Sequence, residues 1–213
     1  MINLSQLLES RDARAQHQKD LLGKYPGKSL LCLTVQLPGP EKRNAQSLAI
    51  ARAGVSAIRQ AFQPDYEELR DLETGYEGYF LVAGDPLDVK RRACQIEDTH
   101  PLGRLMDIDV LTAENYFLQG FAKNQFSAAS DNEKPTAEAN FFSQGFAKNQ
   151  FAPANATPTR VHIISREDIG LASRRCLLCD NVVRFCMRAK THTTNELLKR
   201  IEQLLKEYEL QAP

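Results

Sequence analysis

The spacing of hydrophobic and polar residues predicts a chain in which helices and strands alternate. Apolar residues three or four positions apart are typical of amphipathic helices, whereas continuous apolar runs or two-residue alternation are typical of strands. The segments with helical spacing are residues 3–22, 43–62, 86–98 and 194–210. The strand-like segments are 28–37, the two halves of 66–85 around a glycine turn, 106–111 and 159–168. Residues 174–192 are predicted to be a helix or a turn that leads into one.

Residues 113–159 interrupt this pattern. The octapeptide QGFAKNQF occurs at 119–126 and again at 144–151, a period of 25 residues, between stretches rich in Ala, Asn, Ser and Pro. Two copies are fewer than a stacked repeat fold needs. We therefore expect a long disordered loop inserted in a hairpin between two strands. The alternative is a partner-binding segment that uses Phe121, Phe126, Phe146 and Phe151.

Composition narrows the possible function classes. The 213 residues include 27 basic and 27 acidic ones, so the chain lacks the positive excess with which nucleic-acid-binding proteins contact phosphates. No apolar run approaches the roughly 20 residues of a membrane-spanning helix, and the N-terminus lacks the apolar stretch of a secretion signal. The five cysteines are an odd number, which favours reduced thiols. We expect a cytoplasmic protein that binds neither nucleic acid nor membranes.

Two aspartates lie one residue apart in an otherwise apolar segment, HPLGRLMDIDVL at 100–111. Successive side chains of a strand alternate between its faces, so Asp107 and Asp109 point to one face while Met106, Ile108 and Val110 point to the other. Their carboxylates lie roughly 7 Å apart along the strand, within reach of one or two divalent cations. Aspartate is disfavoured in strands, which favours a functional face, and the alternative is a solvated edge strand with two ordinary aspartates.

Several basic residues are candidates for binding phosphate beside this acidic strand. The turn before it supplies Arg104, and His100 is either a polar ligand or a turn residue. Lys42 follows another predicted strand, in the loop LPGPEK at 37–42, and can reach a phosphate, although the loop lacks Walker spacing. A turn, cations and paired carboxylates are what phosphoryl chemistry requires, because oxygen ligands hold Mg²⁺ or Mn²⁺ and cations neutralise phosphate oxygens.

A second group of residues has the composition of a zinc site. Three cysteines and a histidine occur with the spacing C-x2-C-x6-C-x5-H, and these are plausible zinc ligands. They are Cys176, Cys179, Cys186 and His192. The alternative is a helix with its cysteines buried as small apolar groups, because Cys179 and Cys186 are two helical turns apart. The spacing alone leaves both interpretations open.

The chain resembles the apo-citrate lyase phosphoribosyl-dephospho-CoA transferases. The resemblance covers nearly the whole chain except 113–159, from which the family pattern is absent. The segments that carry it are HPLGRLMDIDVL, ESRDAR at 9–14, TVQLPGPEK at 34–42, SRED at 165–168 and the cysteine-rich 174–192. It implies a nucleotidyltransferase-like fold, so we expect one α+β domain over 1–213, with a mixed β-sheet and flanking helices.

The resemblance also implies an activity, and it is positional at Gly103, Arg104, Asp107 and Asp109; the other site residues below are expectations from the residues themselves. Such an enzyme transfers a phosphoribosyl-dephospho-CoA group from its triphosphate precursor to a serine of the acyl carrier (gamma) subunit of citrate lyase, and pyrophosphate leaves. Asp107 and Asp109 would bind Mg²⁺ or Mn²⁺ and act in catalysis with Arg104, and Glu97 or Asp168 would supply a third carboxylate. The predicted substrate-binding residues are Lys42, Gly39, Gly103, His100, Arg174 and Arg175. The alternative function is a non-catalytic interaction module stabilised by zinc.

Overall fold

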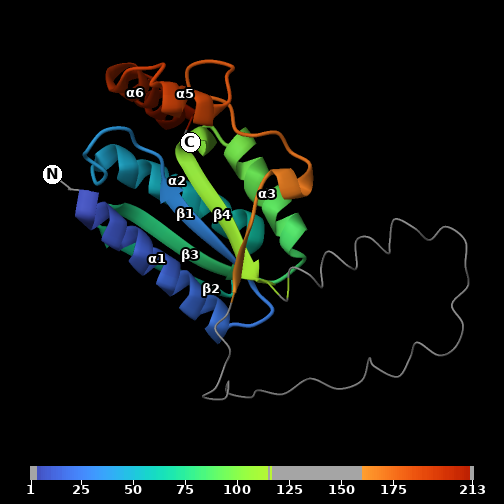
Figure 1. The fold of residues 1–213 in the computed structure, drawn as a ribbon. Coiled ribbons are helices and arrows are strands. Elements are labelled where there is room, and N and C mark those ends of the chain that lie inside the picture. Colours follow the sequence, from blue (N-terminus) through green and yellow to red (C-terminus); the bar gives the residue numbers. More distant parts are fainter. Residues whose placement is uncertain (1–3, 115, 117–159, 212–213) are drawn as a thin grey trace, which may run out of the picture.

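The computed structural model describes residues 4–114, 116 and 160–211 (Figure 1). The two octapeptide repeats and their phenylalanines lie outside the described residues. The helices are α1 (Leu4–Lys24), α2 (Ala45–Phe62), α3 (Pro86–Thr99), α5 (Val183–Ala189) and α6 (Thr194–Gln211). The strands are β1 (Ser29–Val35), β2 (Tyr66–Leu72), β3 (Gly75–Val82), β4 (Met106–Ala113) and β5 (Val161–Ile164). The predicted elements are thus confirmed, with a shorter last strand, and 174–192 proves to be a turn that leads into the short helix α5.

The five strands form one sheet in the order β2-β3-β1-β4-β5, and every neighbouring pair is antiparallel. The predicted mixed sheet is therefore wrong. Helix α2 connects β1 to β2, and α3 connects β3 to β4, and each of these two strand pairs runs in the same direction. In each case an antiparallel strand lies between the two, so the helical connections that suggested parallel pairing create no parallel ladder.

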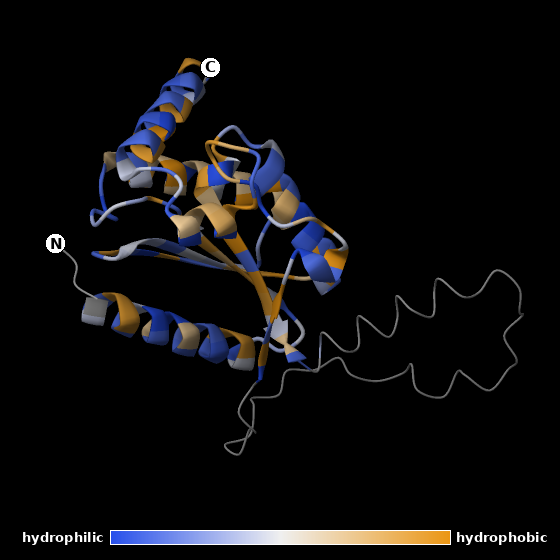
Figure 2. Cartoon of the chain, turned by 45° about the horizontal axis from the view of Figure 1, so that its top comes forward, coloured by the Kyte–Doolittle hydropathy of each residue, from blue (hydrophilic) through white to orange (hydrophobic). Residues whose placement is uncertain are grey.

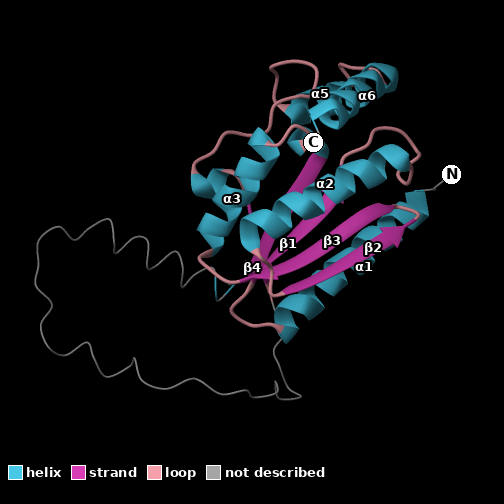
Figure 3. Ribbon diagram, turned by 180° about the vertical axis from the view of Figure 1, so that it is seen from behind, coloured by secondary structure: helices cyan, strands magenta, loops and turns pink. Residues whose placement is uncertain are grey.

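The sheet has helices on both faces. Figure 1 and, from behind, Figure 3 show α1 along one face and α2 and α3 across the other. Apolar side chains of α2, α3 and α6 pack with Leu31, Phe80 and Ile108 of the sheet in the larger core. A smaller core under α1 joins Leu21 and Leu22 to the opposite sheet face. Figure 2 shows the hydrophobic central strands and the mixed polar and apolar surfaces of the outer helices.

Local sequence signals set the helix ends. Asn44 caps α2 by accepting a hydrogen bond from the backbone N–H of Ser47, and the Ser47 hydroxyl accepts from the Asn44 backbone in return. Asp85 caps α3 directly before Pro86, a residue that suits the first helical turn. Among the described residues, no helix is long and apolar enough to cross a membrane.

Candidate functional site

Strand β4 presents the two aspartates as its alternation predicts. Met106, Ile108 and Val110 are fully buried in the larger core, whereas Asp107 is half-buried and Asp109 is exposed on the α1 face. In the sheet, Asp107 lies opposite Thr34 and Asp109 lies opposite Cys32, both on the central strand β1. The prediction that one face of this strand is structural and the other acidic is confirmed.

Two side chains from distant parts of the sequence hold Asp107. Gln36, just after β1, donates a hydrogen bond of 2.8 Å from Nε2 to one carboxylate oxygen. Arg174 donates from Nη1 to the other oxygen at 3.2 Å and forms an ion pair with it. Arg174 also donates to the backbone oxygen of Met106 at 2.7 Å. The guanidinium therefore fixes both the carboxylate and the strand that carries it.

The edge of β4 explains why charged residues gather here. Strand β5 pairs only with Val110–Ala113, so the earlier backbone groups on that side of β4 need other partners. The buried carboxylate of Glu97 accepts from the Ile108 N–H at 2.8 Å, and the buried Lys90 ammonium donates to the Ile108 oxygen at 3.3 Å. Arg174 likewise donates to the Met106 oxygen. These side chains form the hydrogen bonds that a longer β5 would otherwise form with this part of β4.

Neither predicted third carboxylate joins the two aspartates. Glu97 is committed to the Ile108 N–H and to Arg166, which lies 3.1 Å away, and burial raises the pKa of its carboxyl. Asp168 accepts from the backbone and hydroxyl of Ser165 in a local turn. Asp168 therefore has structural partners of its own, whereas Glu97 shares the Arg174 guanidinium with Asp107, with Nη1 3.8 Å from its carboxylate.

Asp109 differs from Asp107 in its surroundings. Within the described part of the chain, no side chain donates a hydrogen bond to its carboxylate, which stays open to solvent at one side. The protein packed around the carboxylate, and next the neighbouring charge of Asp107, raise the pKa of Asp109. Lys90, Arg14 and Arg174 act in the opposite direction. The carboxylate is thus a better proton acceptor than an ordinary surface aspartate.

The acidic face continues under α1 into a polar network that the sequence did not indicate. Arg14 of α1 pairs with the buried carboxylate of Glu77 on β3, with Nε 2.7 Å from the oxygen. Gln18 donates to the sulfur of Cys32, which is the residue opposite Asp109. Arg14 belongs to the ESRDAR motif of the family resemblance, but only the packing of α1 places it two strands from Asp107.

Arg104 and Gly103 lie in the short turn before β4. A guanidinium nitrogen of Arg104 donates to the backbone oxygen of Arg175, and its Nε is buried without a partner in the described residues. Burial, and then the positive charge of Arg174, lower the pKa of Arg104. Two neighbouring cations, one with an unsatisfied donor, favour an anion between them. Gly103 is buried, and a Cβ there would lie 2.5 Å from the Ile96 oxygen, so this glycine permits the turn to pack on α3.

The other predicted substrate-binding residues are spread along the same end of the sheet. Lys42 donates to the backbone oxygen of Leu37, and burial lowers its pKa. Gly39, with φ +86°, lies beside Thr194 at the start of α6. His100 accepts from the Leu102 N–H at 3.0 Å as a turn residue, and its ring lies against Tyr208 of α6. Arg175 is exposed and donates to the backbone oxygen of Asp180.

The cysteine–histidine cluster (Cys176, Cys179, Cys186 and His192) forms a compact group in the segment around α5. All four potential ligand atoms lie within 4.8 Å of one another. The interpretation of the cysteines as a helical stripe is wrong, because Cys176 and Cys179 precede α5 and only Cys186 lies in it. The five cysteines of the chain are free thiols, as expected.

The described residues also contain a pocket of about 440 Å³ between α2 and the β2–β3 hairpin. Leu33, Val55 and Leu69 line it, and Leu33 belongs to the core that packs under α2. The pocket therefore opens on the sheet face opposite Asp107 and Asp109.

Comparison with known proteins identifies the chain's relatives. A family model described as apo-citrate lyase phosphoribosyl-dephospho-CoA transferase matches residues 2–128 and 156–208. The chain belongs to this family. Curated proteins with that name from Escherichia coli O1:K1 and Shigella boydii serotype 18 are each 31% identical over 209 residues. Each alignment covers 96% of this chain and 88% of the relative.

The family match also changes the bounds of the insertion. The internal gap in the match is residues 129–155, so the departure from the family pattern is narrower than the expected 113–159. The first octapeptide repeat, at 119–126, lies within the matched part, and the second, at 144–151, lies in the unmatched part. The boundary lies inside the low-complexity region, where composition alone gives no signal.

Proposed function

We propose that this transferase moves a phosphoribosyl-dephospho-CoA group from a triphosphate precursor to a serine of the apo acyl carrier (gamma) subunit of citrate lyase. The observation that carries the proposal is the pair of aspartates on one face of β4, with Arg174 and Arg104 at the same strand end. In the reaction the serine oxygen bonds to the phosphorus next to the ribose. The bond to pyrophosphate breaks, and a phosphodiester remains. The family membership disfavours the alternative of a non-catalytic zinc module.

Asp109 is suited to orient the serine hydroxyl and to receive its proton on a carboxylate oxygen that a bound cation leaves free. Its carboxylate is open to solvent and has no side-chain donor among the described residues. The position of such a base counts for more here than its pKa, because a bound cation would lower the pKa of Asp109. Asp107, which is held by Gln36 and Arg174, supplies a fixed negative charge beside it.

The nearby cations are suited to bind the triphosphate. Arg174 and Arg104 approach each other closely enough for the first to lower the pKa of the second. Phosphate oxygens between them would relieve that repulsion and satisfy the buried Nε of Arg104. Lys42 follows β1 at the same end of the sheet, and its ammonium group would contact the triphosphate from that side. Positive charge fixed in this way stabilises the charge that develops on the leaving pyrophosphate.

The two aspartates fit a magnesium or manganese ion. Mg²⁺ commonly takes one or two protein carboxylates and completes its shell with water and substrate phosphates, so the lack of a third carboxylate is no obstacle. Asp107 and Asp109 would hold such an ion, which would neutralise phosphate charge. The nucleotidyltransferase-like fold implied by the resemblance stays a prediction.

The decisive experiment is the incubation of the purified chain with apo carrier subunit, triphosphate precursor and Mg²⁺, followed by intact mass of the carrier. The wild-type chain should add one phosphoribosyl-dephospho-CoA group per carrier. Asp107→Asn and Asp109→Asn should each lower the rate by about 10²–10³, the range for removal of one preorganised electrostatic group.

Asp88→Asn is the matched control, because Asp88 is an exposed residue of α3 that contacts Arg91. It should transfer at the wild-type rate. Ile108→Ala tests the opposite face and should cost about 2–5 kcal/mol of stability through a core cavity. If both site variants transfer as fast as Asp88→Asn with unchanged Mg²⁺ dependence, the acidic face has no part in the reaction.

A further inference from the structure

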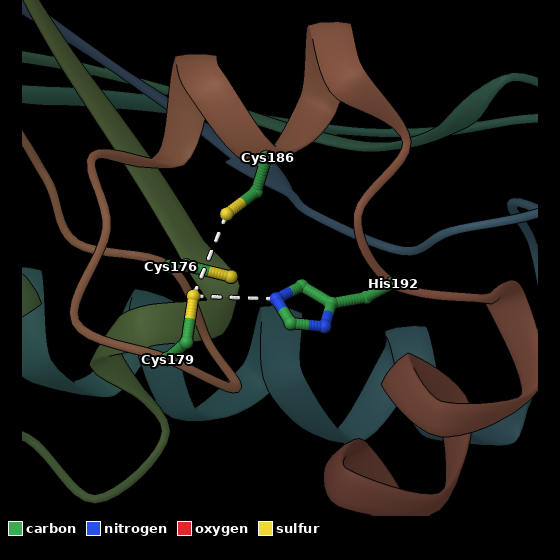
Figure 4. Close-up of side chains that lie close together, drawn as sticks. All are labelled: Cys176, Cys179, Cys186 and His192. Atoms are coloured by element: carbon green, nitrogen blue, oxygen red, sulfur yellow. Dashed lines mark hydrogen bonds between the residues drawn. The ribbon is translucent and has the colours of Figure 1, made fainter.

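The cysteine–histidine cluster has the geometry of a closed metal site. The sulfurs of Cys179 and Cys186 are 3.5 Å apart, and Nε2 of His192 is 3.3 Å from the Cys179 sulfur (Figure 4). In a tetrahedral zinc site with the usual bond lengths, two ligand sulfurs lie about 3.8 Å apart, and a ligand sulfur and nitrogen lie about 3.6 Å apart. Figure 4 shows the four side chains converging from the turn, from α5 and from the segment after it. Small adjustments therefore suffice to enclose one ion.

The backbone around the cluster is built to bring these ligands together. Arg175 and Val182 form an antiparallel bridge, and the Cys176 N–H donates to the Asn181 oxygen at 2.7 Å, which closes a tight hairpin. Cys176 and Cys179 lie in this hairpin, and Cys186 faces them from the helix that follows. Lys190 then reverses the chain with φ 49°, so that His192 returns to the same point.

Leu177 packs against the larger core, but helix α5 adds little apolar packing to this segment. Of the residues in α5 only Cys186 is buried, whereas Phe185 and Met187 are 61% and 70% exposed. The helix has seven residues, far fewer than the 12–15 at which an isolated helix becomes even marginally stable. A segment with so small an apolar core requires another source of stability, and a zinc ion bound by thiolates and imidazole is such a source.

We infer that the cysteine–histidine cluster binds one zinc ion, which fixes the segment carrying Arg174 against Asp107. The metal part of this inference stands by itself, and the positioning part rests on the proposed function. Three thiolates and one imidazole complete the tetrahedral shell of a structural zinc, so no position stays open for substrate. Cys176 is two residues from Arg174 and one from Arg175, whose backbone oxygen accepts from Arg104. The ion would thus anchor the chain beside both cations of the site.

Metal analysis of the purified full-length chain tests the binding. After dialysis against metal-free buffer, mass spectrometry of the metal should give about one zinc per chain, as expected for a four-ligand structural site. Cys179→Ser should lose the zinc, and the matched control Cys94→Ser, at a buried cysteine of α3, should keep it. If Cys179→Ser fails to fold, His192→Cys should retain zinc and His192→Ala should lose it. Wild-type chain without zinc, or zinc retained in both His192→Ala and Cys179→Ser, overturns the inference.

A double-mutant cycle tests the positioning role. Loss of zinc in His192→Ala should lower the transfer rate about 10²–10³-fold, as loss of the Arg174 guanidinium would, and His192→Cys should restore it. In an Arg174→Met background, loss of zinc should lower the rate little further, because both changes remove the same contact. Full additivity, or a zinc-free chain with wild-type kinetics, refutes the positioning role. A zinc-bound chain that never modifies the carrier instead refutes the proposed function and leaves the zinc site standing.

Discussion

Replacement of Arg174 by methionine separates the effect of charge at the site from the effect of stability. Methionine keeps an unbranched side chain of similar length but removes the guanidinium. The change breaks the ion pair with Asp107 and leaves the Met106 carbonyl, which accepts at 2.7 Å, without this donor. Removal of a charged donor from a buried carbonyl costs about 1.5–3 kcal/mol. The ion pair is partly exposed, at 19% and 34% for its two side chains, so it adds up to about 1 kcal/mol.

These contributions predict a loss of about 1.5–4 kcal/mol in the free energy of unfolding. For a chain of this size each kcal/mol lowers the melting temperature by about 2–4 °C, so we expect a shift of about 3–16 °C. At a temperature where the variant stays folded, the rate of carrier modification should fall about 10²–10³-fold, because a phosphate-facing cation is lost. Differential scanning calorimetry and intact mass of the carrier measure the two effects.

Arg166→Met is the matched control. Arg166 has a similar exposure of 14% and pairs with Glu97 and Asp98, but it has no contact with Asp107. It should lose comparable stability and keep the wild-type transfer rate at low temperature. If Arg174→Met also transfers at the wild-type rate while folded, or if both variants slow equally, the assignment of Arg174 to the phosphate site is refuted.

Three further changes test other parts of the structure. Gly103→Ala should cost about 1–3 kcal/mol, because its Cβ would lie 2.5 Å from the Ile96 oxygen, and an unchanged urea midpoint would show that the turn adapts. Because the pKa of Asp109 is raised in the folded chain, this group contributes stability below its ordinary pKa that is lost as the pH rises through the raised value. Asp109→Asn should therefore weaken the fall in melting temperature above about pH 4, and parallel pH profiles would contradict this reasoning. Deletion of 129–155, which the family match omits, should leave melting and transfer nearly unchanged, since each doubling of loop length costs only about 0.6 kcal/mol; a folded but inactive deletion variant would assign that segment a function.

The sequence alone determined the elements and the two faces of β4. Two-residue alternation separates Asp107 and Asp109 from Ile108 whatever the strand's neighbours are, because it follows from the strand itself. Helical spacing located α2, and helical spacing together with Pro86 at a first helical position located α3. These properties depend on residues close together in the chain, so local patterns are sufficient to predict them.

Only the tertiary structure decided which partners these residues have. Strand order decided that the sheet is wholly antiparallel, because β3 and β1 each separate two strands that run in the same direction. The short pairing of β5 left backbone groups of β4 unpaired, and that requirement brings Glu97 and Arg174 to the strand edge. Arg174 meets Asp107 across 67 residues of sequence. No local pattern encodes such a contact, because it depends on how the edge strand ends and how the C-terminal segment packs against it.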